Sequence, residues 1–352
     1  MWLLAFAGIL ASWLAIGLGG VSTGAAEADR LERFRELAAS RLSALDLSGS
    51  ESAFELFREM YALLDDEILE SLAAGSVFAS KGFLQERLDA FNEAWGGSAF
   101  RILNLPTGDV RVGSFQIFPG AWGNSVRVYG RVGGRAQLLA AIHRAGIPQV
   151  FAFPPAGTGQ GQFLAVWVGP PSARGTPAIQ IELWRQEGDR LRAVWSTANL
   201  FGPDLYATAW EVRGQEISVR YEVRYPGWTP GCEGQTEQED HYRYVPASET
   251  FLLARRQVHN GWHRELHATV ERLLVALEQG DQRVLSALGL TQELQRGLPD
   301  RLEPEPACDI LDGPSPQVVT VSATTPGDPR PWALRFQYTR NGWRLAGSER
   351  LP

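Results

Sequence analysis

Three of the five histidines in this chain fall within residues 259–267, which makes that segment the first candidate for metal chemistry. His263 and His267 are four residues apart, so on a helix their imidazoles share one side and could bind Zn²⁺, with Glu271 one turn further on. The order differs from the His-Glu-x-x-His pattern of zinc proteases, because Glu265 would point away from the metal. The segment therefore suggests a metal site and does not indicate a protease.

Two other interpretations of this histidine segment remain open. If Asn260 and Gly261 form a hairpin turn, residues 263, 265 and 267 alternate onto one face of a strand. Alternatively, both histidines are boundary residues of a helix whose apolar stripe includes Leu266. Zinc titration distinguishes a metal site from boundary packing.

The chain has only two cysteines, Cys232 and Cys308, and both lie in stretches rich in proline, glycine and polar residues. In an oxidising compartment an even pair most simply forms a disulfide. This bond would close a loop of about 76 residues, which chain entropy values at roughly 4–5 kcal/mol at most. In the cytosol two reduced thiols would be expected instead.

Acidic residues lie close to both cysteines. Bridging the cysteines would bring these carboxylates together, and a hard cation such as Ca²⁺ would relieve their repulsion. The alternative is a pair of solvated acidic loops, since no EF-hand pattern is present. The candidate ligands are Glu237 and Asp240 after Cys232, and Asp309 and Asp312 after Cys308.

Two tryptophans, Trp122 and Trp228, stand at Pro-Gly turns, and Tyr225 opens the second of these turns. Such turns present a side chain at a loop tip, where an exposed aromatic ring could stack on a sugar or a peptide. The alternative is packing that closes the loop, because tryptophan is usually mostly buried. These three aromatic residues are the candidate ligand contacts.

Motifs that would define an enzyme are missing from the sequence. The glycine-rich stretch 156–162 lacks the Gly-Lys-Ser/Thr ending of a phosphate loop, and no Gly-x-Ser-x-Gly motif is present. If the protein is nevertheless catalytic, the first residues to inspect for shifted pKa values in a pocket are His143, Glu182 and His241.

The composition describes a globular protein with enough apolar residues for more than one core, since 44% of its 352 residues are hydrophobic and 21% are charged. The formal net charge is -7 and there is no basic tract. Nucleic acid is therefore a disfavoured partner, because phosphate binding depends on clustered Lys and Arg.

The N-terminal segment 1–26 reads as an export signal. Residues 2–21 carry no charge, as in a secretory signal peptide or a single membrane anchor, and small residues suited to a signal peptidase follow. No Lys or Arg precedes the apolar run, so a buried helix is a third possibility. Both leading interpretations place the rest of the chain in the periplasm or outside the cell, with membrane contact only through residues 2–21 if the segment is uncleaved.

Apolar spacing then divides residues 27–258 into helices followed by sheet. Residues 28–96 have a helical period, with helices expected at 52–72 and 83–95. From 100 to 258 the period becomes two, which predicts about ten short antiparallel strands and one possible helix at 136–145. A sub-boundary is expected near 170–200. The absence of regular strand-helix alternation argues against a doubly wound nucleotide fold.

Residues 259–352 form a predicted C-terminal module of helices followed by sheet. Helices are expected from Trp262 to Gly280 and over 282–298, and strands near 318–321, 332–338 and 343–346. Asn341-Gly342 predicts a hairpin between the last two strands. This order, with its final Gly-Trp-Arg-Leu strand, resembles the NTF2-like cone fold. The resemblance implies a curved sheet around a cavity and carries no catalytic residues, because this fold hosts both enzymes and binding domains.

Together these features predict an α+β protein exported from a bacterial-type cell. We expect a non-catalytic envelope or secreted protein that binds or scaffolds a small molecule, a glycan or another envelope protein. The alternative is an extracytoplasmic hydrolase that uses the cavity of a cone-shaped sheet. No cofactor is required by any motif, although Ca²⁺ or Zn²⁺ would fit the candidate ligands above.

Overall fold

The computed structural model describes residues 22–45, 51–97, 99–107, 110–117, 124–157, 159–172, 175–202 and 205–352. The predicted signal or anchor at 2–21 lies outside these residues, and so does Trp122. Within the described part of the chain, no helix is both long enough and apolar enough to cross a membrane.

The chain folds into two compact units. The first contains Met1–Pro170 and Gln180–Leu200, and the second contains Pro171–Ile179 and Phe201–Pro352. The chain therefore passes between the units inside the range 170–200, and residues 258 and 259 both lie in the second unit. The predicted mixed α+β class with antiparallel sheets is confirmed in both units.

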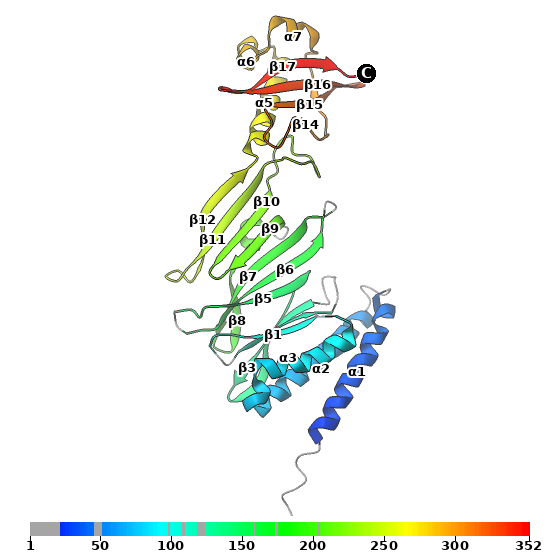
Figure 1. The fold of residues 1–352 in the computed structure, drawn as a ribbon, viewed down its shortest axis with the longest axis vertical. Helices are drawn as coiled ribbons and strands as arrows, with labels where there is room; N and C mark the ends of the chain where they lie inside the picture. The colour runs from blue at the N-terminus through cyan, green and yellow to red at the C-terminus, as the bar shows by residue number, and fades with distance from the viewer. Residues whose placement is uncertain are drawn as a thin grey trace, which may run out of the picture. The chain divides into compact units, whose positions relative to one another are not determined.

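Three helices of the first unit pack on one face of a four-stranded sheet with the order β1-β2-β3-β4 (Figure 1). Their shared core joins Phe34, Leu64 and Phe91 from the helices to Phe100 and Phe115 from the sheet. Apolar residues recur at helical spacing before residue 96 and at strand spacing after it, because the chain changes there from helices to strands. The elements are α1 (Ser22–Leu45), α2 (Glu51–Ala74), the 3₁₀ turn η1 (Ser76–Ala79), α3 (Lys81–Trp95), β1 (Phe100–Asn104), β2 (Arg111–Gln116), β3 (Asn124–Val132) and β4 (Arg135–His143).

The first unit also contains antiparallel strands of a second sheet, in which β6 lies between β5 and β7, and β8 pairs with β7. Strand β5 contacts β1, β2 and β3 of the other sheet. Buried Phe163, Ala165 and Trp167 on β6 pack against Val112 of β2 and Val128 of β3, so the two sheets share a core. The bounds are β5 (Ile147–Phe153), β6 (Gln162–Pro171), β7 (Pro177–Glu187), β8 (Arg190–Ser196) and the short helix α4 (Ala198–Phe201).

The second unit begins with an antiparallel meander in the order β9-β10-β11-β12, and Ala178 and Ile179 at the start of β7 pair with β9. A helical segment and an antiparallel sheet follow, and Leu266 and Leu273 of α5 share a core with Phe336 of β16. The bounds are β9 (Leu205–Arg213), β10 (Glu216–Glu222), β11 (Glu237–Val245), β12 (Thr250–His259), α5 (Gly261–Gln279), α6 (Gln282–Ala287), α7 (Gln292–Gly297), β13 (Glu303–Pro304), β14 (Ile310–Leu311), β15 (Val318–Thr325), β16 (Asp328–Thr339) and β17 (Gly342–Arg350).

Two predicted helices are wrong. Residues 136–145 belong largely to strand β4, because this segment pairs with β3 along its length and tertiary pairing outweighs the helix propensity of its Leu and Ala residues. Residues 282–298 form two short helices, since Asp281 caps the start of α6 and Thr291 caps a separate start for α7.

The predicted C-terminal hairpin is present, but its turn lies one residue earlier than expected. Strand β16 ends at Thr339 and β17 begins at Gly342, so Arg340 and Asn341 form the loop. Of these residues only Gly342 has a positive φ, at 90°. Glycine adopts this left-handed conformation readily because it has no Cβ atom.

Candidate metal centre

Helix α5 presents both histidines of the predicted pair on its buried face. His263, Leu266, His267 and Val270 follow one another at helical spacing on that face. The hairpin alternative is wrong, because the helix begins at Gly261. The hydroxyl of Thr236 secures this start by accepting a hydrogen bond from the Arg264 amide at 3.1 Å and donating one to the Asn260 carbonyl at 2.8 Å.

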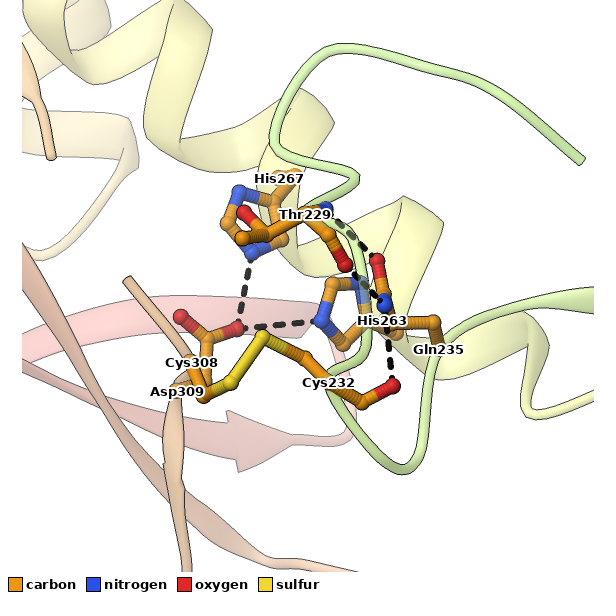
Figure 2. Close-up of a disulfide and its surroundings, with 7 residues drawn as sticks. All are labelled: Thr229, Cys232, Gln235, His263, His267, Cys308 and Asp309. Atoms are coloured by element: carbon orange, nitrogen blue, oxygen red, sulfur yellow. Dashed lines mark hydrogen bonds and ion pairs between the residues drawn. A yellow bond between two sulfur atoms is a disulfide. The ribbon is translucent and has the colours of Figure 1, made fainter. Parts of the chain in front are cut away.

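The carboxylate of Asp309 lies beside the two imidazoles and contacts both, as Figure 2 shows. Its Oδ2 atom is 3.1 Å from Nε2 of His263 and 2.8 Å from Nε2 of His267. The rings are stacked, with centroids 4.6 Å apart and planes at 25°. One ligand atom from each residue lies within 4.8 Å of the other two, which makes a compact three-ligand group.

The disulfide holds Asp309 in this position. Cys232 and Cys308 are bonded, with an S–S distance of 2.03 Å, which confirms the predicted pairing. Because Asp309 directly follows Cys308, the bond fixes the carboxylate beside the loop that contains Cys232 (Figure 2). The buried Gln235 amide braces that loop, accepting from the Thr229 amide at 2.7 Å and donating to the Cys232 carbonyl at 2.9 Å.

The other side of the His263 ring is held by Tyr225. The tyrosine hydroxyl is 2.7 Å from Nδ1 of His263 and accepts a hydrogen bond from the Thr236 amide at 3.0 Å. Burial raises the pKa of Tyr225, so the hydroxyl keeps its proton at neutral pH. The hydroxyl can accept a hydrogen bond from a protonated Nδ1, and in that tautomer the Nε2 lone pair is free to bind a metal.

A Pro-Gly turn closes over His267. The Trp228 amide donates to the Tyr225 carbonyl at 2.9 Å, and Gly227 has a φ of 85°. A Cβ atom on residue 227 would lie only 1.8 Å from Nδ1 of His267. Residue 227 must therefore be glycine for two reasons: its backbone is left-handed, and the imidazole of His267 leaves no space for a side chain.

The charge state of Asp309 suits a cation. Burial acts to raise the pKa of its carboxyl, but hydrogen bonds and charge interactions with His263 and His267 outweigh burial and hold the pKa below its usual value. The carboxylate is therefore ionised at neutral pH and faces two imidazole nitrogens.

This ligand set matches Zn²⁺ and related transition metals better than Ca²⁺, because Ca²⁺ prefers six to eight oxygen ligands. With bonds of about 2.0–2.2 Å to zinc, neighbouring ligands of a tetrahedral site lie roughly 3.4 Å apart. The distances of 2.8 and 3.1 Å from Asp309 to the histidines are only slightly shorter, so small outward shifts admit an ion.

The other predicted metal ligands are not part of this group. Glu237 pairs with Arg220, and Asp240 accepts two hydrogen bonds from Arg256. Both acids lie on strand β11 instead of in an acidic loop, and Asp240 stands opposite Arg256 of β12. Asp312 accepts backbone N–H bonds of residues 317 and 318, and Glu271 is exposed on α5. Among the described residues, the four predicted acids therefore do not form one cluster of metal ligands.

The candidate aromatic contacts are used within the fold. Tyr225 points its hydroxyl at His263, as described above. Trp228 is half-buried, and the Arg224 guanidinium lies 5.3 Å from the centre of its ring. The structure therefore places the Tyr225 hydroxyl against His263, one of the candidate metal ligands.

The three residues selected as possible catalytic groups have separate partners. His143 on β4 contacts the ring of Tyr61, with centroids 5.9 Å apart. Glu182 on β7 is buried and accepts hydrogen bonds from Gln180 at 2.8 Å and Trp184 at 3.1 Å. His241 on β11 pairs with Glu239 at 3.1 Å.

Sequence reasoning assigned Asp309 to a calcium cluster and Tyr225 to a ligand surface, and it missed the contribution of both to the histidine pair. The one usable signal for Asp309 was its position next to Cys308, since the expected disulfide brings that residue toward the segment before α5. No pattern pointed to Thr236 or Gly227, whose roles depend on contacts across the fold.

Comparison with known proteins gives no family for this chain. No protein-family model and no curated protein matches it. Similar solved structures include a hypothetical selenium-binding protein from Sulfolobus tokodaii, at 9% identity, 72% coverage of this chain, 55% of that chain and a TM-score of 0.25. Another is an α-L-arabinanase from Penicillium chrysogenum complexed with arabinobiose, at 11% identity, 72% and 66% coverage and a TM-score of 0.24. This chain spans less than two thirds of either structure, and TM-scores this low carry no argument.

Proposed function

We propose that this is an exported, non-catalytic binding protein whose second unit binds a divalent transition metal through His263, His267 and Asp309. The observation that carries the proposal is the position of one carboxylate oxygen 3.1 and 2.8 Å from two imidazole Nε2 atoms. Two nitrogens and one anionic oxygen converging on a point form the donor set of a zinc-type site.

Burial supports binding over catalysis at this site. The side chains of His263, His267 and Asp309 are 4%, 7% and 6% exposed. A hydrolytic metal needs an open coordination position that a substrate can reach, whereas a structural or sequestered ion is enclosed by the protein. Enclosure favours a retained ion that ties α5 to the Cys308 segment.

The disulfide and the order of elements support the remaining parts of the proposal. A disulfide between the only two cysteines fits an oxidising compartment and hence export. Helices α5, α6 and α7 precede the sheet of β15, β16 and β17, which is the order expected of an NTF2-like module. A module of this kind serves here as the scaffold for the metal site.

Zinc titration of the full chain, followed by calorimetry and thermal unfolding, tests this function. We expect one Zn²⁺ per chain in the parent and no binding in the His263→Ala/His267→Ala variant. Free zinc at about 100 times Kd would stabilise the parent by about 2.7 kcal/mol, because the ion binds the folded state. Ca²⁺ should have no comparable effect.

The matched control removes two other imidazoles from the same unit, in the variant His241→Ala/His259→Ala. Both of these histidines pair with Glu239, and an Arg255 nitrogen lies 2.8 Å from Nε2 of His241, which disfavours a cation there. The control should bind zinc like the parent. Failure of the parent to bind zinc, or loss of binding in the control alone, rejects the site.

A further inference from the structure

A cavity of about 550 Å³ lies in the first unit, between the β1–β2 hairpin and strand β5. This volume falls within the range of small-molecule sites, roughly 300–1,000 Å³. Both of its flanking strands, β1 and β5, stand at the edge of their sheets, and Figure 1 shows them next to each other. The cavity is therefore lined by strands that belong to two different sheets.

Among the described residues that line this cavity, the charged side chains are all positive. Lys81, at the start of α3, and Arg101 on β1 line it, and none of the lining residues is acidic. Neither cation has a hydrogen bond or ion pair with any residue that the structure describes, and both are exposed.

The wall of the cavity also holds a buried polar group. Ser114 on β2 is 6% exposed and lines the cavity. Its neighbour Phe115 points to the helix-covered face, so Ser114 and Gln116 project to the opposite face, toward β5. A hydroxyl in this wall can donate a hydrogen bond to an oxygen atom of a ligand in the cavity.

Apolar side chains complete the lining. Leu103, Ile147 and Val150 line the cavity together with the polar groups. A ligand that fits this wall has a charged head near Lys81 and Arg101 and an apolar body against these residues.

We propose that this cavity binds a small organic oxyanion, a carboxylate or a phosphate ester with an apolar body. Lys81 and Arg101 neutralise the head group, and the Ser114 hydroxyl and Gln116 amide donate hydrogen bonds to its oxygens. This site is independent of the metal centre, because all of its residues belong to the first unit.

Calorimetric titration of the full chain with hexyl phosphate, hexanoate and hexanol tests the proposal. We expect the anions to bind at least tenfold more tightly than hexanol, and their affinity to fall as salt is raised, because screening weakens the charge interactions. Tighter binding of hexyl phosphate than of hexanoate identifies a phosphate ester as the ligand class, and the reverse order identifies a carboxylate.

The variant Lys81→Ala/Arg101→Ala should weaken anion binding at least tenfold. The control Arg135→Ala/Arg190→Ala removes the same charge from two exposed arginines that do not line the cavity, and it should bind like the parent. Ser114→Ala should weaken binding about two- to fivefold without lowering the unfolding temperature.

Three results would overturn the anion site. These are no binding of either anion by the parent, equal binding of the anions and hexanol, and unchanged anion binding in the Lys81→Ala/Arg101→Ala variant. Since Lys81 and Arg101 are exposed, their removal should leave the unfolding temperature within one or two degrees of the parent, so loss of binding would not reflect unfolding.

Discussion

At the scale of single residues, Asp309 connects two hypotheses that sequence patterns had kept apart. The sequence assigned its carboxylate to an acidic loop and the histidines to a helix, yet one oxygen of this carboxylate contacts both imidazole rings. At the proposed site, a metal would take the place of protons at the Nε2 atoms of His263 and His267, which face a common anion. Metal binding therefore releases protons, and zinc affinity should increase with pH.

Gly227 gives a test of how tightly His267 is positioned. Gly227→Ala places a Cβ atom in the space of the imidazole, where the distance to Nδ1 would be 1.8 Å, and adds left-handed strain at a φ of 85°. We expect the free energy of unfolding to fall by more than the backbone cost of about 1–3 kcal/mol, and zinc affinity to fall as well. Urea denaturation and zinc titration measure the two effects.

Gly231→Ala in the same loop is the matched control. Its φ is 79°, but nothing lies within 4 Å of a Cβ added there. It should show the backbone cost alone and retain zinc binding. Equal zinc affinity in the two variants would mean that the imidazole of His267 is not confined by the turn.

At the scale of elements, strand β11 contains a buried carboxylate that organises its sheet. Asp240 is fully buried and lies opposite Arg256 of β12, which donates two hydrogen bonds to it at 2.8 and 2.9 Å. Tyr221 and Tyr242 donate at 3.1 and 3.2 Å. Burial acts to raise the pKa of Asp240, but the hydrogen bonds from Arg256 and the tyrosines outweigh it and hold the pKa below its usual value.

This depressed pKa predicts acid sensitivity of the second unit. A carboxyl whose pKa is lower in the folded state stabilises the fold fully above its unfolded value of about 3.9, and the stabilisation is lost as pH falls through the folded value. Asp240→Asn should lower the free energy of unfolding by about 1–3 kcal/mol at pH 7. The difference from the parent should shrink below about pH 4.

Urea denaturation at several pH values gives this comparison, with Glu216→Gln as control. Glu216 pairs with Arg243 across β10 and β11, but its side chain is 58% exposed. An exposed pair contributes little, so the control should differ only slightly from the parent at any pH. A pH-independent loss in Asp240→Asn would show that packing, and not the charge, accounts for the effect.

At the scale of the whole molecule, one covalent bond ties together segments 76 residues apart within the second unit. Reduction should destabilise that unit by up to about 4–5 kcal/mol, because the unfolded chain regains the entropy of the open loop. It should also weaken zinc binding, since the bond positions Asp309. The reductant has no other target, because the chain contains no further cysteine.

Mass spectrometry after alkylation, with and without reduction, measures the state of Cys232 and Cys308 directly. We expect neither cysteine of the native protein to be alkylated, and both to react after reduction. The Cys232→Ala/Cys308→Ala variant should reproduce the stability of the reduced parent in urea. Two reactive thiols in the native protein would contradict the disulfide and remove the main support for export.

Local patterns were sufficient to predict the helices before residue 96, the antiparallel strands that follow and helix α5. Apolar periodicity reports which side of an element is buried, and this information lies within a few neighbouring residues. The cysteine pairing was also predictable, because only one pair was available. The helix predicted at 136–145 was wrong because local spacing does not report pairing with a distant strand, and pairing with β3 outweighs the local helix preference of this segment.

Contacts between distant segments could not be read from the chain. Asp309 lies 42 positions from His267, and its place beside Cys308 indicates only that it comes near the segment before α5, not that its carboxylate meets both imidazoles. Likewise, Lys81, Arg101 and Ser114 become neighbours only because β1, β2 and the start of α3 surround one cavity. Such sites depend on how elements pack, and packing is set by the combined burial of many residues instead of by the spacing of a few.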